Sequence, residues 1–102
     1  MKAKLSDVFE AIISEREYQD RRWNSKTTIS SGQHELESFV LYIEDYIREM
    51  KTILSRTAQQ EAYEKSAHIM RKIAALTVAA MEQHGAPLRE DSTIVTGMGM
   101  DK

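Results

Sequence analysis

The chain has 102 residues with no cysteine, one proline and four glycines, and its 14 Lys and Arg against 16 Asp and Glu give a formal net charge of −2. This balance excludes a protein that binds nucleic acid through bulk positive charge. The lack of cysteine excludes disulfides and thiolate zinc sites, and so few helix breakers exclude an all-β fold. No apolar run approaches the ~20 residues of a membrane span, so we expect a soluble, cytoplasmic protein without a membrane partner.

The first predicted element is a helix from Ser6 to about Trp23. Ser6 and Asp7 have the residue types of an N-cap, and apolar residues follow at helical spacing, namely Val8, Phe9, Ile12 and Ile13. Residues 24–32 (NSKTTISSG) are rich in Ser, Thr and Asn and end in Gly. This composition predicts a loop after the first helix.

A second helix is predicted to begin near Gln33, which stands three residues after Ser30 in the spacing of a capping box. Its apolar residues recur at steps of three and four and form one continuous stripe, namely Leu36, Phe39, Val40, Ile43, Ile47, Met50 and Leu54. Leu41, Tyr46 and Ile53 widen the stripe on one flank. We therefore expect this helix to be covered on more than one side.

A third helix is predicted to open with Thr57 and Gln60, again in capping-box spacing, and to run to about His84. Gly85 is the expected C-terminal residue beyond the helix, and Pro87 prevents its continuation. Residues 73–81 (IAALTVAAM) are apolar nearly all round, as in a helix that other helices surround.

These elements predict an all-α fold, a helical bundle of three main helices in residues 1–90, followed by a flexible tail or docking arm in residues 91–102. The apolar faces of the second and third helices exceed what one subunit can bury. We therefore expect the bundle to be completed by oligomerisation, as a homodimer or a higher even homo-oligomer. The predicted core positions are Phe39, Ile43, Ile73 and Val78.

One candidate site lies in the second half of the first helix, where Arg16, Gln19 and Trp23 share a face. An indole can stack on a base, an amide can bond a base edge and a guanidinium can bind phosphate. This combination predicts a nucleotide site, to which Lys26 in the following segment would contribute. The alternative is a half-buried Trp23 that closes the core, with Arg16 and Gln19 as its solvated rim.

A second candidate site is acidic. Glu44 and Asp45 are adjacent, Glu49 lies one turn beyond Asp45, and carboxylates so spaced on a helix can bind magnesium with further oxygen ligands. The third helix would have to supply those ligands. The alternative is that these acids form the solvated face of a long helix. The three histidines lack the spacing of a helical zinc pair, and none is expected to bind metal.

Taken together, the chain resembles the small MazG-like proteins of the all-α nucleoside triphosphate pyrophosphohydrolase superfamily, particularly short versions from phages. The resemblance rests on Glu15-Arg16, Gln19 and Trp23, on Ile43-Glu44-Asp45, and on residues 71–76 and 81–87. It implies a dimeric bundle in which a Glu-Glu-x-x-Glu run and a Glu-x-x-Asp run hold magnesium, and in which water cleaves between the α- and β-phosphates.

The chain departs from that pattern at most of the metal positions. Glu44 and Asp45 match the first two acids, but Arg48 stands at the third, and Ile69 and Lys72 replace the second pair. Arg48 and Lys72 would then supply positive charge in place of the metal. This favours a non-catalytic nucleotide-binding protein without cofactor, which could sequester a nucleotide-derived signal in a phage–host setting.

Two alternatives stay open. The first is a magnesium-dependent pyrophosphohydrolase, in which Glu44 and Asp45 would bind the metal. The second is a helical interaction module that binds no small ligand. Three observations would separate these hypotheses. Nucleotide binding in the presence of a chelator would favour the non-catalytic binder, and magnesium-dependent release of pyrophosphate would favour the enzyme. Capture of a protein partner without any nucleotide effect would favour the interaction module.

Overall fold

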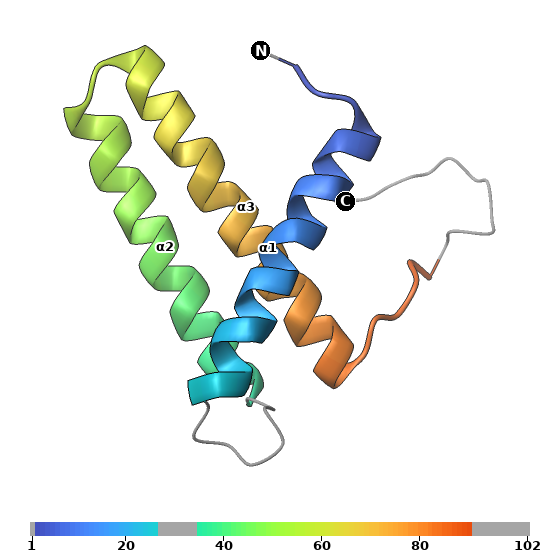
Figure 1. The fold of residues 1–102 in the computed structure, drawn as a ribbon. Helices are drawn as coiled ribbons and strands as arrows, with labels where there is room; N and C mark the ends of the chain where they lie inside the picture. The colour runs from blue at the N-terminus through green and yellow to red at the C-terminus, as the bar shows by residue number, and fades with distance from the viewer. Residues whose placement is uncertain (1, 27–34, 91–102) are drawn as a thin grey trace.

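The computed structural model describes residues 2–26 and 35–90, and this part of the chain contains three α-helices and no strand. They are α1 (Leu5–Lys26), α2 (Leu36–Arg56) and α3 (Gln59–His84) (Figure 1). The predicted all-α fold of three main helices is therefore confirmed. The tail predicted in residues 91–102 lies outside the described residues.

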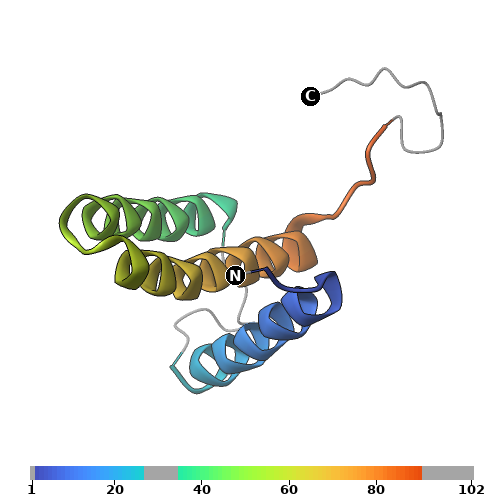
Figure 2. The ribbon, with the colours of Figure 1, turned by 90° about the horizontal axis from the view of Figure 1, so that it is seen from above.

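The three helices are arranged around α3. The two residues Thr57 and Ala58 connect α2 to α3, so the two helices form an antiparallel hairpin (Figure 1). α1 also packs against α3, and Figure 2 shows α3 between the other two helices. In the described residues α1 and α2 make no close backbone contact with each other, so the bundle is open on one side.

The helix ends differ in part from the predicted ones. α1 begins at Leu5, one residue before the predicted start, and it includes residues 24–26, which were predicted as loop. α3 begins at Gln59 after the N-cap Ala58, which has no side-chain capping bond, so the capping box predicted at Thr57 is wrong. The N-cap of α2 is Glu35. The capping box predicted at Ser30 and Gln33 falls outside the described residues.

The predicted end of the third helix is confirmed. α3 ends at His84, and the backbone N–H of Gly85 donates to the carbonyl oxygen of Met81 at 2.8 Å. Gly85 has a φ of 117°, which residues with a Cβ rarely adopt. A glycine at this position therefore lets the chain turn away from the helix axis before Pro87.

The core lies between α2 and α3 and is built on one aromatic ring and small residues. Phe39, Leu76, Ala79 and Ala80 form a buried cluster, and Trp23 from α1 packs on it with its ring centroid 6.1 Å from that of Phe39. Ala79 is fully buried. Because alanine side chains are short, they let neighbouring helices approach α3 closely.

Of the four predicted core positions, Phe39 is buried as expected, whereas Ile43, Ile73 and Val78 are only half-buried. The sequence predicted that α2 would be covered on more than one side and that other helices would surround α3, whereas the described helices leave one side of the bundle open. The radius of gyration is 16.3 Å, whereas a compact chain of this length has one of about 13 Å. No described helix has the length and apolar character needed to cross a membrane.

Candidate functional site

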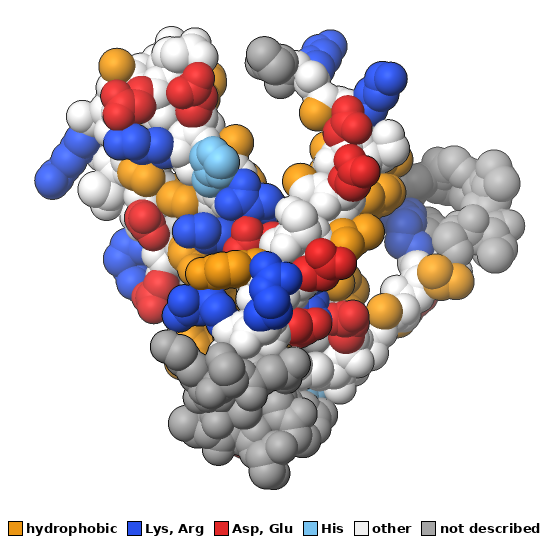
Figure 3. Space-filling model, viewed as in Figure 1, with side chains coloured by type: hydrophobic (Ala, Val, Ile, Leu, Met, Phe, Trp, Pro, Cys, Tyr) orange, Lys and Arg blue, Asp and Glu red, His pale blue; other side chains and the backbone are white. Residues whose placement is uncertain are grey.

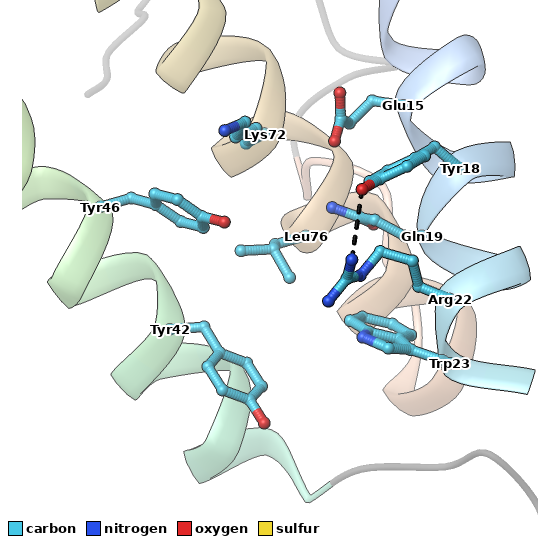
Figure 4. Close-up of a pocket in the computed structure, with 9 residues that line it drawn as sticks. All are labelled: Glu15, Tyr18, Gln19, Arg22, Trp23, Tyr42, Tyr46, Lys72 and Leu76. Carbon is cyan, nitrogen blue, oxygen red and sulfur yellow. Dashed lines mark hydrogen bonds between the residues drawn. The ribbon is translucent and has the colours of Figure 1, made fainter. Parts of the chain in front are cut away.

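All three helices contribute to one pocket of about 330 Å³. A volume of about 300 Å³ is the lower end of the range for small-molecule sites. The pocket opens on the face of Figure 3 where α1 faces α2, and basic and hydrophobic side chains meet there. Its walls are shown in Figure 4, and the lining residues are Glu15, Tyr18, Gln19, Arg22, Trp23, Tyr42, Tyr46, Lys72 and Leu76.

Burial divides the pocket into a floor and a mouth. The floor consists of Glu15, Gln19 and Leu76, which are at most 8% exposed. The mouth consists of exposed side chains at the outer rim, namely Tyr18, Arg22 and Tyr42. A ligand in this pocket would therefore meet polar groups at the floor and aromatic and cationic groups at the mouth.

Each cation of the pocket lies over a tyrosine ring. Lys72 Nζ lies 5.6 Å from the ring centroid of Tyr46, and the Arg22 guanidinium lies 5.8 Å from that of Tyr18. Arg22 also donates a hydrogen bond to the Tyr18 hydroxyl at 3.3 Å (Figure 4). Such contacts stabilise the cations in place. The pocket thus has two positioned positive charges, one from α1 and one from α3.

The carboxylate of the floor is held by an arginine from outside the pocket. Arg71 on α3 donates from Nε to Glu15 Oε1 at 2.8 Å, and its Nη1 lies 2.7 Å from His68 Nδ1. Arg71 and Glu15 thus form an ion pair that joins α3 to α1. The pair offsets the cost of burying the carboxylate and fixes its position on α1.

Gln19 lies one helical turn beyond Glu15 and is the second polar group of the floor. Its Oε1 is buried and has no hydrogen-bond partner within the described residues. An unpartnered buried amide group is unfavourable by about 1–3 kcal/mol. The floor of the pocket therefore contains one unsatisfied acceptor, the buried oxygen of Gln19.

The first predicted site is brought together only in part. Gln19 and Trp23 line the pocket, and Trp23 also packs on Phe39, so it serves the core and the pocket at once. Lys26 is the last residue of α1. Arg16 is not among the lining residues, because its side chain is directed to Glu82 on α3.

Arg16 is held firmly away from the pocket. Its Nε and Nη2 donate to Glu82 Oε1 at 3.0 and 2.6 Å, and its Nη1 lies 3.0 Å from Asp20 Oδ1. Burial by itself would lower the pKa of Arg16, but the bonds to Glu82 and Asp20 outweigh it and raise the pKa. This guanidinium fastens α1 to α3.

The two cations predicted to face a phosphate together are separated. Lys72 lines the pocket, but Arg48 does not, since its exposed guanidinium pairs with Asp45 at 2.7 Å. Arg48 lies two residues beyond Tyr46, and positions two apart on a helix point to nearly opposite sides. Because Tyr46 lines the pocket, Arg48 is directed away from it.

The acids of the chain do not fit the magnesium site that the resemblance implies. Glu44 and Asp45 are exposed, and Asp45 is paired with Arg48. Ile69 is buried in the core, and Lys72 lies over Tyr46. Over residues 2–26 and 35–90, no group of three or more His, Cys, Asp and Glu side chains is placed to hold a metal ion.

Tyr18, Tyr42 and Arg22, which line the pocket, were not predicted as site residues from the sequence. Tyr18 and Arg22, and likewise Tyr42 and Tyr46, are four residues apart, so each pair shares one face of its helix. The two tyrosines at positions 42 and 46 were a usable signal for an aromatic face on the second helix. It could not show that the two faces meet across one pocket, because that depends on how α1 and α2 are placed on α3.

Comparison of the chain with protein-family models, with curated proteins and with solved structures finds no match. The resemblance to MazG-like proteins stays a prediction.

Proposed function

We propose that the protein binds a nucleotide in the pocket between its three helices, and that it holds this ligand without a metal ion. The observation that carries the proposal is the combination of aromatic rings and cations around one pocket of suitable volume. Flat aromatic rings are surfaces on which bases stack. Ammonium and guanidinium groups are the side chains that bind phosphate.

The burial gradient favours one orientation of such a ligand. The base would enter between Trp23 and Tyr46 and rest on Leu76, whereas the phosphate would stay at the mouth near Arg22 and Lys72. A phosphate keeps part of its hydration there, which avoids the large free-energy cost of burying a charge. Lys72 occupies the position where the resemblance implies a metal-binding acid, which supports binding over hydrolysis.

The proposal is tested by titrating nucleoside monophosphates and triphosphates into the protein in the presence of a chelator. Trp23 is the only tryptophan of the chain, so quenching of its fluorescence reports on ligand in the pocket. Ligand at about 100 times Kd should stabilise the protein by ~2.7 kcal/mol in a melting assay. The affinity should decrease with added salt, because phosphate binding to cations is screened.

Two matched variants locate the binding site. Lys72→Met keeps the aliphatic chain over Tyr46 but removes the charge, and it should weaken binding by about tenfold or more. Arg48→Met removes an exposed cation on the other side of α2 and should leave the affinity unchanged. Equal losses in both variants, or pyrophosphate release by the wild type with magnesium, would contradict the proposal.

We also propose that copies of the chain associate through a second, apolar surface. Where the first half of α1 diverges from α3, a groove of about 380 Å³ is lined mainly by apolar side chains, among them Val8, Ile12 and Met70. Next to it Phe9 and Ile13 are 55% and 57% exposed. Contiguous apolar surface of this kind indicates a protein interface.

Light scattering at micromolar concentration tests this association. A mass of at least twice 11.7 kDa is expected for the wild type, and Ile13→Asp should shift the protein toward the monomer because it places a charge in the buried contact. Glu17→Asp on the same helix is the control. A wild-type mass of one chain would contradict the proposal and leave nucleotide binding untouched.

A further inference from the structure

We infer that the pocket selects guanine among the nucleobases, because its floor presents a buried carboxylate and a buried amide side by side. This inference rests on the proposed nucleotide binding and names the base that the site would take. It depends on Glu15 and Gln19, which are both 8% exposed and stand one helical turn apart on α1.

The Glu15 carboxylate is held in place by Arg71, but not all of its hydrogen-bond acceptor positions are used. Arg71 bonds to Oε1 of Glu15, and a carboxylate has about four acceptor positions on its two oxygens. It can therefore keep Arg71 and accept further N–H groups from a ligand. Figure 4 shows the Glu15 carboxylate above Gln19, across the pocket from Tyr46.

The Gln19 amide is the second group that would hydrogen-bond to the edge of the base. Figure 4 shows the Gln19 amide nitrogen pointing from α1 toward the space between the helices. Its oxygen is buried and has no partner in the described part of the chain, so the nitrogen Nε2 is the atom of this amide that a ligand reaches. Nε2 is then available to donate to a carbonyl oxygen of a bound base.

The edge of guanine matches this arrangement better than any other base. Guanine carries two adjacent donors, N1–H and the N2 amino group, which a carboxylate accepts together, and next to them the acceptor O6. Adenine, cytosine and uracil each offer the carboxylate one donor in place of two. A matched pair of hydrogen bonds to a base edge gives roughly 5- to 150-fold discrimination.

The experiment is calorimetric titration of the wild type with GMP, IMP and AMP in the presence of a chelator. IMP has the same ring, N1–H and O6 as GMP and lacks only the N2 amino group. GMP should bind at least about tenfold more tightly than IMP and AMP. Trp23 fluorescence in parallel shows that each of the three ligands occupies this pocket.

The Glu15→Gln variant tests whether Glu15 is the side chain that accepts a hydrogen bond from the N2 amino group of guanine. Glutamine keeps the size of the side chain and an oxygen for Arg71, but it cannot accept two donors side by side. The variant should bind GMP and IMP with affinities within about threefold of each other. Glu17→Gln, an exposed carboxylate on the same helix, should keep the wild-type preference.

The outcomes separate the inference from the function on which it rests. Preference for GMP that Glu15→Gln removes supports the inference. Binding of all three nucleotides with similar affinities overturns the inference and leaves the proposed function standing. Binding of none of them, together with no binding of the other nucleoside monophosphates and triphosphates, overturns both. The comparison of ligands on the wild type does not depend on whether a variant folds.

Discussion

Leu76 gives the sharpest test of the packing, because it belongs to the core and to the pocket at once. It is 3% exposed and lies in the cluster with Phe39, Ala79 and Ala80, while one side of it faces the pocket. Truncation to alanine removes buried methyl groups and leaves a cavity beside Phe39. We expect Leu76→Ala to destabilise the protein strongly.

The size of the effect follows from the surroundings of Leu76. Leu→Ala changes in cores cost about 2–5 kcal/mol, the larger values applying where neighbours surround the side chain completely. Because the pocket already leaves one side of Leu76 without neighbours, we expect a loss of about 2–3 kcal/mol. For a domain of this size 1 kcal/mol corresponds to about 4–8 °C, so Tm should fall by roughly 8–24 °C.

The assay is thermal and chemical unfolding followed by far-UV circular dichroism. Leu88→Ala is the matched control, because Leu88 is 83% exposed and its truncation should stay within about 0.5 kcal/mol of the wild type. Measurement at two protein concentrations separates folding from association. Equal stability of Leu76→Ala and Leu88→Ala would refute the packing of α2 on α3 described above.

Three further predictions concern single contacts. Arg16→Met should lower Tm without changing nucleotide affinity. Because its bonds to Glu82 and Asp20 raise the pKa of Arg16 above its ordinary value, its side chain keeps its charge throughout the neutral and mildly alkaline range. Tm should therefore fall equally at about pH 7 and about pH 9. Arg71→Met should lower the free energy of unfolding by about 1–3 kcal/mol in the wild type, because it leaves the Glu15 carboxylate buried without its partner. The loss should be clearly smaller in a Glu15→Gln background, and equal losses in a denaturant titration would contradict the pairing. Ala79→Leu should lower the free energy of unfolding by about 1–3 kcal/mol, because the larger side chain overpacks a fully buried position. Higher stability of the variant in chemical unfolding would contradict this and show that the position can hold a leucine.

Much of the secondary structure could be predicted from the sequence, because it depends on local properties of the chain. The scarcity of glycine and proline permits long helices, and Gly85 followed by Pro87 ends the third one at His84. The apolar stripe of α2 identified Phe39 as core. Capping was less predictable, since Ala58 precedes α3 where the capping box at Thr57 was expected.

The composition of the pocket was only partly accessible from the sequence. Gln19, Trp23 and Lys72 were predicted and line the pocket, whereas Arg16 and Arg48 were predicted and do not. Periodicity shows which residues share a face of one helix. It does not show which face turns toward a neighbour, and that rotation decides whether a cation lies in a pocket or in solvent.

The rotation of each helix about its own axis depends on contacts between residues that are far apart in the sequence, so no local pattern predicts it. On α1, the ion pair of Arg16 with Glu82 and that of Glu15 with Arg71 join residues 66 and 56 positions apart in the chain. Together they fix the turn of α1 about its own axis and place Tyr18 and Arg22 at the mouth of the pocket. Such pairings are chosen by the packing of whole helices, since a buried charge is stable only where a partner from another helix reaches it.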